Sequence, residues 1–194
     1  MRPSLRSLLV LCACAVTAAG CAASDDPVAN QAIFDKGVAA YDAKDYAQAF
    51  ALFSSIDNSD LAAMRNVALM LRRGEGTAKD PKAAEEMYAR AAKGGLATAA
   101  ADLGEMLLYG EAGAPDAKAA LPWLEGAAGA GHPIAQYELG TMFEAGDGVP
   151  KDVAQARKLY QAAADGGYDK AKDKLAHLPP GPPETPETPK SPSP

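Results

Sequence analysis

Residues 135–167 read AQYELGTMFEAGDGVPKDVAQARKLYQAAADGG, and the key positions of this stretch recur every 36 residues along the chain. The spacing holds for an aspartate, for two glycines and for a pair of large apolar residues. The recurring residues are Asp80, Asp116 and Asp152; Gly74, Gly110 and Gly146; Gly95, Gly131 and Gly167; and Met87–Tyr88, Trp123–Leu124 and Leu159–Tyr160. A fixed period of this length is typical of a solenoid, in which each unit buries its apolar face against its neighbours. The pattern therefore predicts a repeat protein that presents a binding surface.

Each unit contains two segments with helical periodicity. In the first segment, apolar residues at 67, 68 and 71 and at their equivalents form one stripe, and Ala68, Gly104 and Gly140 allow a second helix to approach closely. A glycine-containing loop follows, in which glycine permits the positive φ that commonly ends a helix. The recurring aspartate then stands where an N-cap residue is expected, and Pro81 suits the first position of the second helix.

These residues resemble the Sel-one-like repeat family, a relative of the tetratricopeptide repeat with longer loops. The third unit carries most of its pattern: Ala135, Leu139–Gly140, Phe143, Gly146–Asp147–Gly148–Val149, Asp152, Leu159–Tyr160, Ala163–Ala164 and Gly167. The resemblance covers residues 61–178, with repeats at 61–96, 97–132 and 133–167. It implies an all-α fold, an α/α solenoid of antiparallel helix pairs, with an adaptor role and no catalytic residues.

The segments that flank the three repeats are also expected to be helical. Residues 29–60 have the spacing of a tetratricopeptide-like helix pair, with Asp45 as a cap and a turn and N-cap at 58–60. Residues 168–178 are expected to form a capping helix. In the proline-rich tail, 179–194, proline recurs every third residue from Pro180 to Pro192, which is the period of polyproline II. A solvated spacer is favoured for this tail over a ligand for a proline-binding groove.

The first 20 residues have the features of a lipoprotein signal peptide. Two arginines precede an apolar stretch too short to span a bilayer, and small residues stand before Cys21. This arrangement resembles the lipobox of bacterial lipoproteins, although Ala18 stands where leucine is preferred. Cys14 is a second candidate, and an ordinary signal peptide is the alternative. We expect a lipid on Cys21, a tether at 21–28, and a protein anchored in the cell envelope, facing the periplasm from the outer membrane.

The net charge indicates which partners are disfavoured, and the cysteine content indicates how the fold is stabilised. Removal of residues 1–20 shifts the formal net charge from −6 to −8, which disfavours nucleic acid and anionic lipid surfaces. After Cys21 the sequence has no cysteine, so packing alone must stabilise the fold.

The sequence shows no catalytic constellation, and we expect neither enzymatic activity nor a cofactor or metal. His132 is expected to be structural in a repeat turn, and His177 suits the end of the capping helix; neither has a second ligand at metal-binding spacing. The glycine-containing loops lack the lysine and the preceding strand of a phosphate loop.

The most informative surface is the inner face of the solenoid, where helix positions around the small crossing residue are expected to line a groove. A protein or peptide is the expected partner, and a cell-wall glycan or muropeptide, with or without weak hydrolysis, is the alternative. Arg65 and Arg72 share one helix face and are predicted to bind an acidic or carboxylate group of the partner. The groove positions are Phe34, Val38, Tyr41, Arg65, Leu69, Arg72, Ala101, Glu105, Leu108, Tyr137, Thr141 and Glu144.

The second helix of the middle unit departs from the repeat pattern. Pro122 falls inside it, where proline costs about 3 kcal/mol, and Gly126 and Gly129 each add roughly 0.5–1 kcal/mol. These residues predict a kinked or late-starting helix between Asp116 and Ala130 that opens before its neighbours do.

Overall fold

The computed structural model describes residues 27–56 and 59–179, and in these residues every regular element is an α-helix. Cys21, the signal peptide, most of the tether, Asn58 and residues 180–194 of the tail lie outside the described residues. The described helices are α1 (Pro27–Asp42), α2 (Tyr46–Ser55), α3 (Leu61–Arg73), α4 (Pro81–Lys93), α5 (Ala97–Tyr109), α6 (Ala117–Gly129), α7 (Pro133–Ala145), α8 (Val153–Asp165) and α9 (Asp169–His177).

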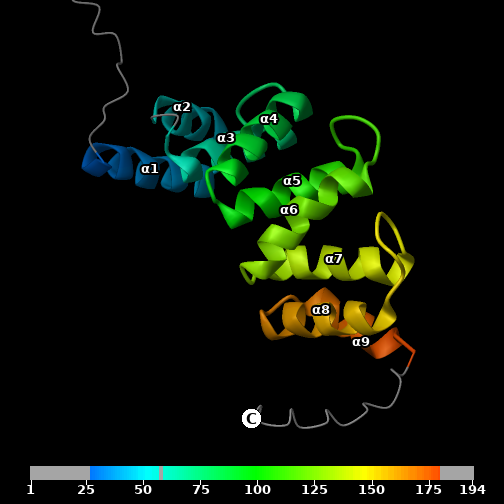
Figure 1. Ribbon diagram of the computed structural model, residues 1–194. Helices are drawn as coiled ribbons and strands as arrows, with labels where there is room; N and C mark the ends of the chain where they lie inside the picture. The colour runs from blue at the N-terminus through cyan, green and yellow to red at the C-terminus, as the bar shows by residue number, and fades with distance from the viewer. Residues whose placement is uncertain (1–26, 57–58, 180–194) are drawn as a thin grey trace, which may run out of the picture.

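The helices pack in chain order, so the predicted α/α solenoid is confirmed. Each helix contacts the next one along the chain, and α5 also contacts α7. Figure 1 shows the resulting row of helix pairs, which runs from α1 at the upper left to α9 at the lower right. The odd-numbered helices α1 to α9 are called the A helices below, and α2 to α8 are the B helices.

The helix ends follow from the residues that recur every 36 positions. The carboxylates of Asp80, Asp116 and Asp152 accept a hydrogen bond from the backbone N–H three residues later, at 3.0, 2.9 and 2.9 Å. At the other end of the loop, Gly74 follows α3 with φ of 74°, and its equivalents Gly110 and Gly146 are also left-handed. The predicted caps are therefore confirmed in all three repeats.

Close approach of the two helices in a repeat depends on the small residue of the A helix. A Cβ added to Gly104 would lie 2.6 Å from the side chain of Leu124, and one added to Gly140 would lie 2.8 Å from the ring of Tyr160. Leu124 and Tyr160 are fully buried, as is Tyr88 at the same position of the first repeat. The core is thus a series of clusters that continue from one repeat to the next.

The middle repeat does not start its second helix late, so that part of the prediction is wrong. Helix α6 begins directly after Asp116 and has 13 residues, the same number as α4 and α8. Pro122 lies inside it. The Asp116 cap and the buried side chains of Ala120, Leu124 and Ala127 hold the helical conformation despite the low intrinsic propensity of proline and glycine.

Candidate binding surface

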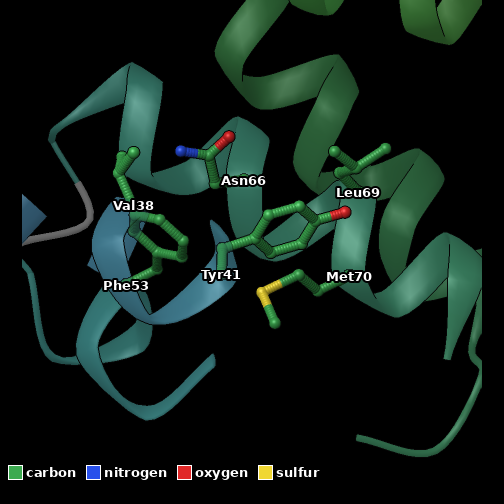
Figure 2. A pocket seen from close by; sticks show the side chains of 6 residues that line it. All are labelled: Val38, Tyr41, Phe53, Asn66, Leu69 and Met70. Atoms are coloured by element: carbon green, nitrogen blue, oxygen red, sulfur yellow. The ribbon is translucent and has the colours of Figure 1, made fainter. Parts of the chain in front are cut away.

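An apolar pocket of about 160 Å³ lies between α1 and α3 and is closed on one side by α2. Its lining side chains converge in Figure 2, where the ring of Tyr41 lies beside Met70 and Leu69. Asn66 and Val38 are partly exposed to solvent and therefore form part of the rim. Apart from Asn66 and the Tyr41 hydroxyl, the lining groups are hydrocarbon or thioether. A pocket of this size and chemistry accommodates one apolar side chain. The lining residues are Val38, Tyr41, Phe53, Asn66, Leu69 and Met70.

Hydrogen bonds hold the Tyr41 ring in place at this pocket. Its hydroxyl donates to the carboxylate of Glu75 at 2.6 Å and accepts from Arg73 at 2.9 Å. Burial and the neighbouring Glu75 carboxylate raise the pKa of Tyr41 above its ordinary value of 10.0, so the phenol stays protonated. The ring also packs edge-on against Tyr46, with 5.2 Å between the ring centroids. Tyr41 is therefore a preorganised wall of the pocket.

The predicted groove residues divide into two groups. Val38, Tyr41 and Leu69 line the pocket, and Phe34 packs beside it with its ring centroid 5.4 Å from that of Phe53. The remaining positions lie further along the surface formed by the exposed side chains of the A helices, called the A-helix face below. Four of them are hydrogen-bonded to another helix: Arg65, Arg72, Glu105 and Glu144.

Both arginines that were predicted to receive a partner's carboxylate are bonded to carboxylates of the chain itself. Nε of Arg65 donates to Asp102 at 2.7 Å. Arg72 donates to Glu105 at 2.9 Å and also to Glu111. The hydrogen bond to Glu111 raises the pKa of Arg72 and lowers the pKa of Glu111. In this arrangement the arginines join α3 to α5 and its following loop.

The same kind of link continues toward the C-terminal end of the A-helix face. The hydroxyl of Tyr109 donates to Glu138 at 2.7 Å, which joins α5 to α7. Glu144 accepts from Tyr160 at 2.6 Å and from Lys174 at 2.8 Å, which joins α7 to α9. These bonds and the arginine pairs form a continuous series between consecutive A helices, called the inter-helix ladder below.

Two other predicted groove residues serve packing. Leu108 is partly buried against the core cluster of the middle repeat. The Tyr137 ring lies between two other tyrosines, with its centroid 5.5 Å from Tyr160 and 5.0 Å from Tyr168.

Asn66 is not among the predicted groove residues, although the sequence carries a signal for its position. Asn66, Asp102, Glu138 and Lys174 are 36 residues apart and occupy the same position on successive A helices. The last three each bond to the preceding A helix. Asn66 lines the pocket. A polar residue at all four equivalent positions is the sequence signal for this row.

The histidines have the structural positions that were expected. Nδ1 of His132 accepts from the backbone N–H of Ala135 at 3.4 Å and caps α7, and burial lowers its pKa. His177 is the last residue of α9. Within residues 27–56 and 59–179, no group of histidine, cysteine and acidic side chains is arranged to hold a metal ion. None of the helices described there is both long enough and apolar enough to cross a membrane.

Comparison with known proteins identifies the repeats. The family model described as Sel1 repeat matches residues 61–96, 97–132 and 133–168. A crystal structure of a Sel1 repeat protein from Oxalobacter formigenes is similar, with 30% identity and a TM-score of 0.68, over 73% of this chain and 58% of that chain. No curated protein matches the sequence.

A second solved structure has the same fold. It is a protective antigen present in uropathogenic Escherichia coli strains that displays an SLR fold, with 25% identity and a TM-score of 0.70. The match covers 75% of this chain and 32% of that chain. This chain thus spans less than two thirds of the length of both structures.

Proposed function

Because the chain belongs to the Sel1 repeat family and carries an apolar pocket between α1 and α3, we propose that it is a protein-binding adaptor whose partner inserts an apolar side chain into this pocket. The observation that carries the proposal is the pocket itself. It combines a hydrocarbon interior with a tyrosine wall held by Glu75 and Arg73, and with an amide at its rim.

The rim amide defines what kind of ligand suits the pocket. Asn66 has both a donor and an acceptor, so it can bond to the N–H or the C=O of a peptide backbone that passes over the rim. A peptide with one aliphatic or aromatic anchor residue matches this pattern. The ion pairs and the Tyr109–Glu138 hydrogen bond of the inter-helix ladder then serve to fix the spacing of α3, α5 and α7 beneath the bound peptide.

The N-terminal sequence supports a location for this adaptor in the cell envelope. A lipid on Cys21 would tether the solenoid to the cell envelope. The next residue is Ala22, whereas an aspartate at this position is the usual signal that retains a lipoprotein in the inner membrane. We therefore propose an outer-membrane lipoprotein that faces the periplasm and recruits a protein there.

The pocket is tested by a pair of matched substitutions. Val38 lines the pocket and Ile134 on α7 does not, yet each is 38% exposed. Val38→Asp places a charge in the pocket, and we expect it to reduce crosslinked partner recovery from envelope extract by about tenfold or more, because an unpaired carboxylate beside apolar groups is poorly solvated. Ile134→Asp should leave recovery unchanged.

Equal recovery with both variants would contradict the proposed pocket. A parallel pulldown on purified sacculi distinguishes a protein from a cell-wall glycan. Retention on sacculi that Val38→Asp abolishes would assign the pocket to a glycan ligand and reject the protein-binding role.

The anchor is tested at Cys21. We expect metabolic palmitate labelling of the native chain, loss of the label in Cys21→Ser, and release of that variant from the membrane fraction. Cys14→Ser is the control and should remain labelled. Absence of label in the native chain would show that the lipid anchor is wrong.

A further inference from the structure

The solenoid carries a second apolar groove, lined by α4, α5 and α6. This groove has a volume of about 300 Å³ and lies between α4 and α6, over the start of α5. Trp123 and Pro122 form one wall, Ala92 and Leu96 form the other, and Ala100 and Gly126 complete it. We call it the Trp123 groove.

The three residues of α6 that depart from the repeat pattern leave the edge of this groove without charged side chains. In the first repeat the equivalents of Pro122, Gly126 and Gly129 are Glu86, Arg90 and Lys93. In the third repeat they are Lys158, Ala162 and Asp165. The middle repeat thus has no long or charged side chain at these three exposed positions, whereas the first repeat has one at all three and the third repeat at two.

Packing within the repeats does not explain these residues. A Cβ added to Gly126 or to Gly129 would meet no atom within 4 Å, and Pro122 is exposed. Glycine in a helix costs about 0.5–1 kcal/mol relative to alanine, and proline costs about 3 kcal/mol. These residues lower the stability of the middle repeat, and no packing contact offsets the loss. We therefore attribute them to the apolar surface that they leave exposed.

The C-terminal sequence has the complementary chemistry. Prolines 180, 183, 186, 189 and 192 recur every third residue, and a polyproline II helix has three residues per turn, so in that conformation they would share one edge. Proline-rich segments of this kind bind apolar grooves lined by aromatic side chains. The Trp123 groove is such a groove, with a tryptophan, a proline, a leucine and small residues in its lining.

We propose that the Trp123 groove binds the proline-rich C-terminal segment of the same chain, residues 180–194. The segment starts beside α8, the B helix that follows α6 along the chain. Leu178 is buried in the core beside α8, and Arg157 of α8 donates a hydrogen bond to the carbonyl of Pro179. The 15 residues after Pro179 span at most about 46 Å at about 3.1 Å per residue, whereas the two helix-to-helix steps from α8 through α7 to α6 cover about 16–20 Å at about 8–10 Å each. The tail is therefore long enough to cross α8 and reach the groove between α6 and α4.

The groove contains the only tryptophan of the chain, which makes the contact measurable. In the full chain, Trp123 emission should be shifted to the blue and less quenched by acrylamide than in a chain that ends at Pro179. A synthetic peptide of residues 180–194 should restore the shift in the shortened chain only at millimolar concentration, because a short tether gives an effective concentration in that range.

The matched variant is Gly126→Arg, which restores the residue type of Arg90 at the equivalent position. Arginine favours the helix over glycine and meets no atom at its Cβ, so the fold should be retained, as circular dichroism will check. In the full chain this variant should move the emission to that of the shortened chain. In the shortened chain it should change the emission little.

Three results would overturn the proposal. The first is identical emission from the full and shortened chains. The second is an equal effect of Gly126→Arg in both chains, which would show that the variant acts on Trp123 without the tail. The third is a shift that depends on protein concentration, which would assign the groove to the tail of a second copy.

Discussion

At the scale of single residues, Glu138 of α7 is a buried carboxyl group in the inter-helix ladder. Its side chain is 5% exposed and accepts a hydrogen bond from Tyr109 at 2.7 Å. Burial raises the pKa of Glu138 above its usual range, and this effect exceeds the opposing effect of the Tyr109 hydroxyl. In the folded chain, therefore, the proton leaves Glu138 at higher pH than in the unfolded chain. Between these two pKa values the folded state binds more protons, so stability falls as pH rises through this window.

We expect Glu138→Gln to remove this dependence. Above the folded-state pKa the variant should be more stable than the native chain, because glutamine carries no charge and its carbonyl can still accept from Tyr109. Below about pH 4 the difference should disappear. Urea denaturation at pH 4 and pH 7 measures it, and Glu125→Gln on the exposed side of α6 is the control. A variant less stable than the native chain at pH 7 would show that the charged form is favoured at this site.

At the scale of the helices, the sequence predicts their number and ends well because each end depends on a nearby residue. Asp116 caps α6 through a backbone N–H only three residues away, and Gly110 ends α5 through its own φ. Such local effects are visible in the order of the residues. The start of α6 was predicted less well, since propensity is a weak guide where buried residues such as Leu124 hold a helix in place.

The candidate site was predicted less completely than the helices. The positions of Tyr41 and Leu69 on the A-helix face follow from helical spacing, and both line the pocket. The bonding partners of Arg65 and Arg72 lie 37 and 33 residues further along, on α5. Such pairs depend on how two helices cross, and helical spacing alone does not specify this. For the same reason, the sequence alone predicted that both arginines are free to bind a partner.

We still expect α6 to open before its neighbours. Pro122 cannot donate to the carbonyl four residues before it, and Gly126 and Gly129 are intrinsically poor helix formers. Native-state hydrogen exchange should show amides of 117–130 exchanging faster than those of 81–93 and 153–165. Equal protection in the three B helices would mean either that packing fully offsets these residues or that the Trp123 groove is occupied. In the chain that ends at Pro179, protection of 117–130 should stay the same in the first case and fall in the second.

At the scale of the whole molecule, the inter-helix ladder holds the row of repeats in one arrangement. Two neighbouring arginines on α3 test its contribution. The Arg72 side chain is 15% exposed and bonds to two carboxylates, whereas the Arg73 side chain is 52% exposed and lies 3.9 Å from Glu75. Their environments differ although their chemistry is the same.

We expect Arg72→Glu to lower the free energy of unfolding by roughly 1–3 kcal/mol, because it leaves Glu105 and Glu111 unpaired beside a third carboxylate. Arg73→Glu should change it by less than about 1 kcal/mol, as is usual for an exposed ion pair. Thermal and urea unfolding measure both. Equal losses would show that the ladder contributes no more than surface charge does.

The 36-residue period also determines how the chain responds to force. Each helix contacts the next one along the chain, so tension applied between the two ends passes through the repeat interfaces one after another. A repeat that gives way releases 36 residues, or about 120–130 Å of extended chain at about 3.3–3.6 Å per residue. Stretching a single molecule between two beads should therefore produce steps of nearly equal length. The middle repeat, with Pro122 in its second helix, should yield at the lowest force.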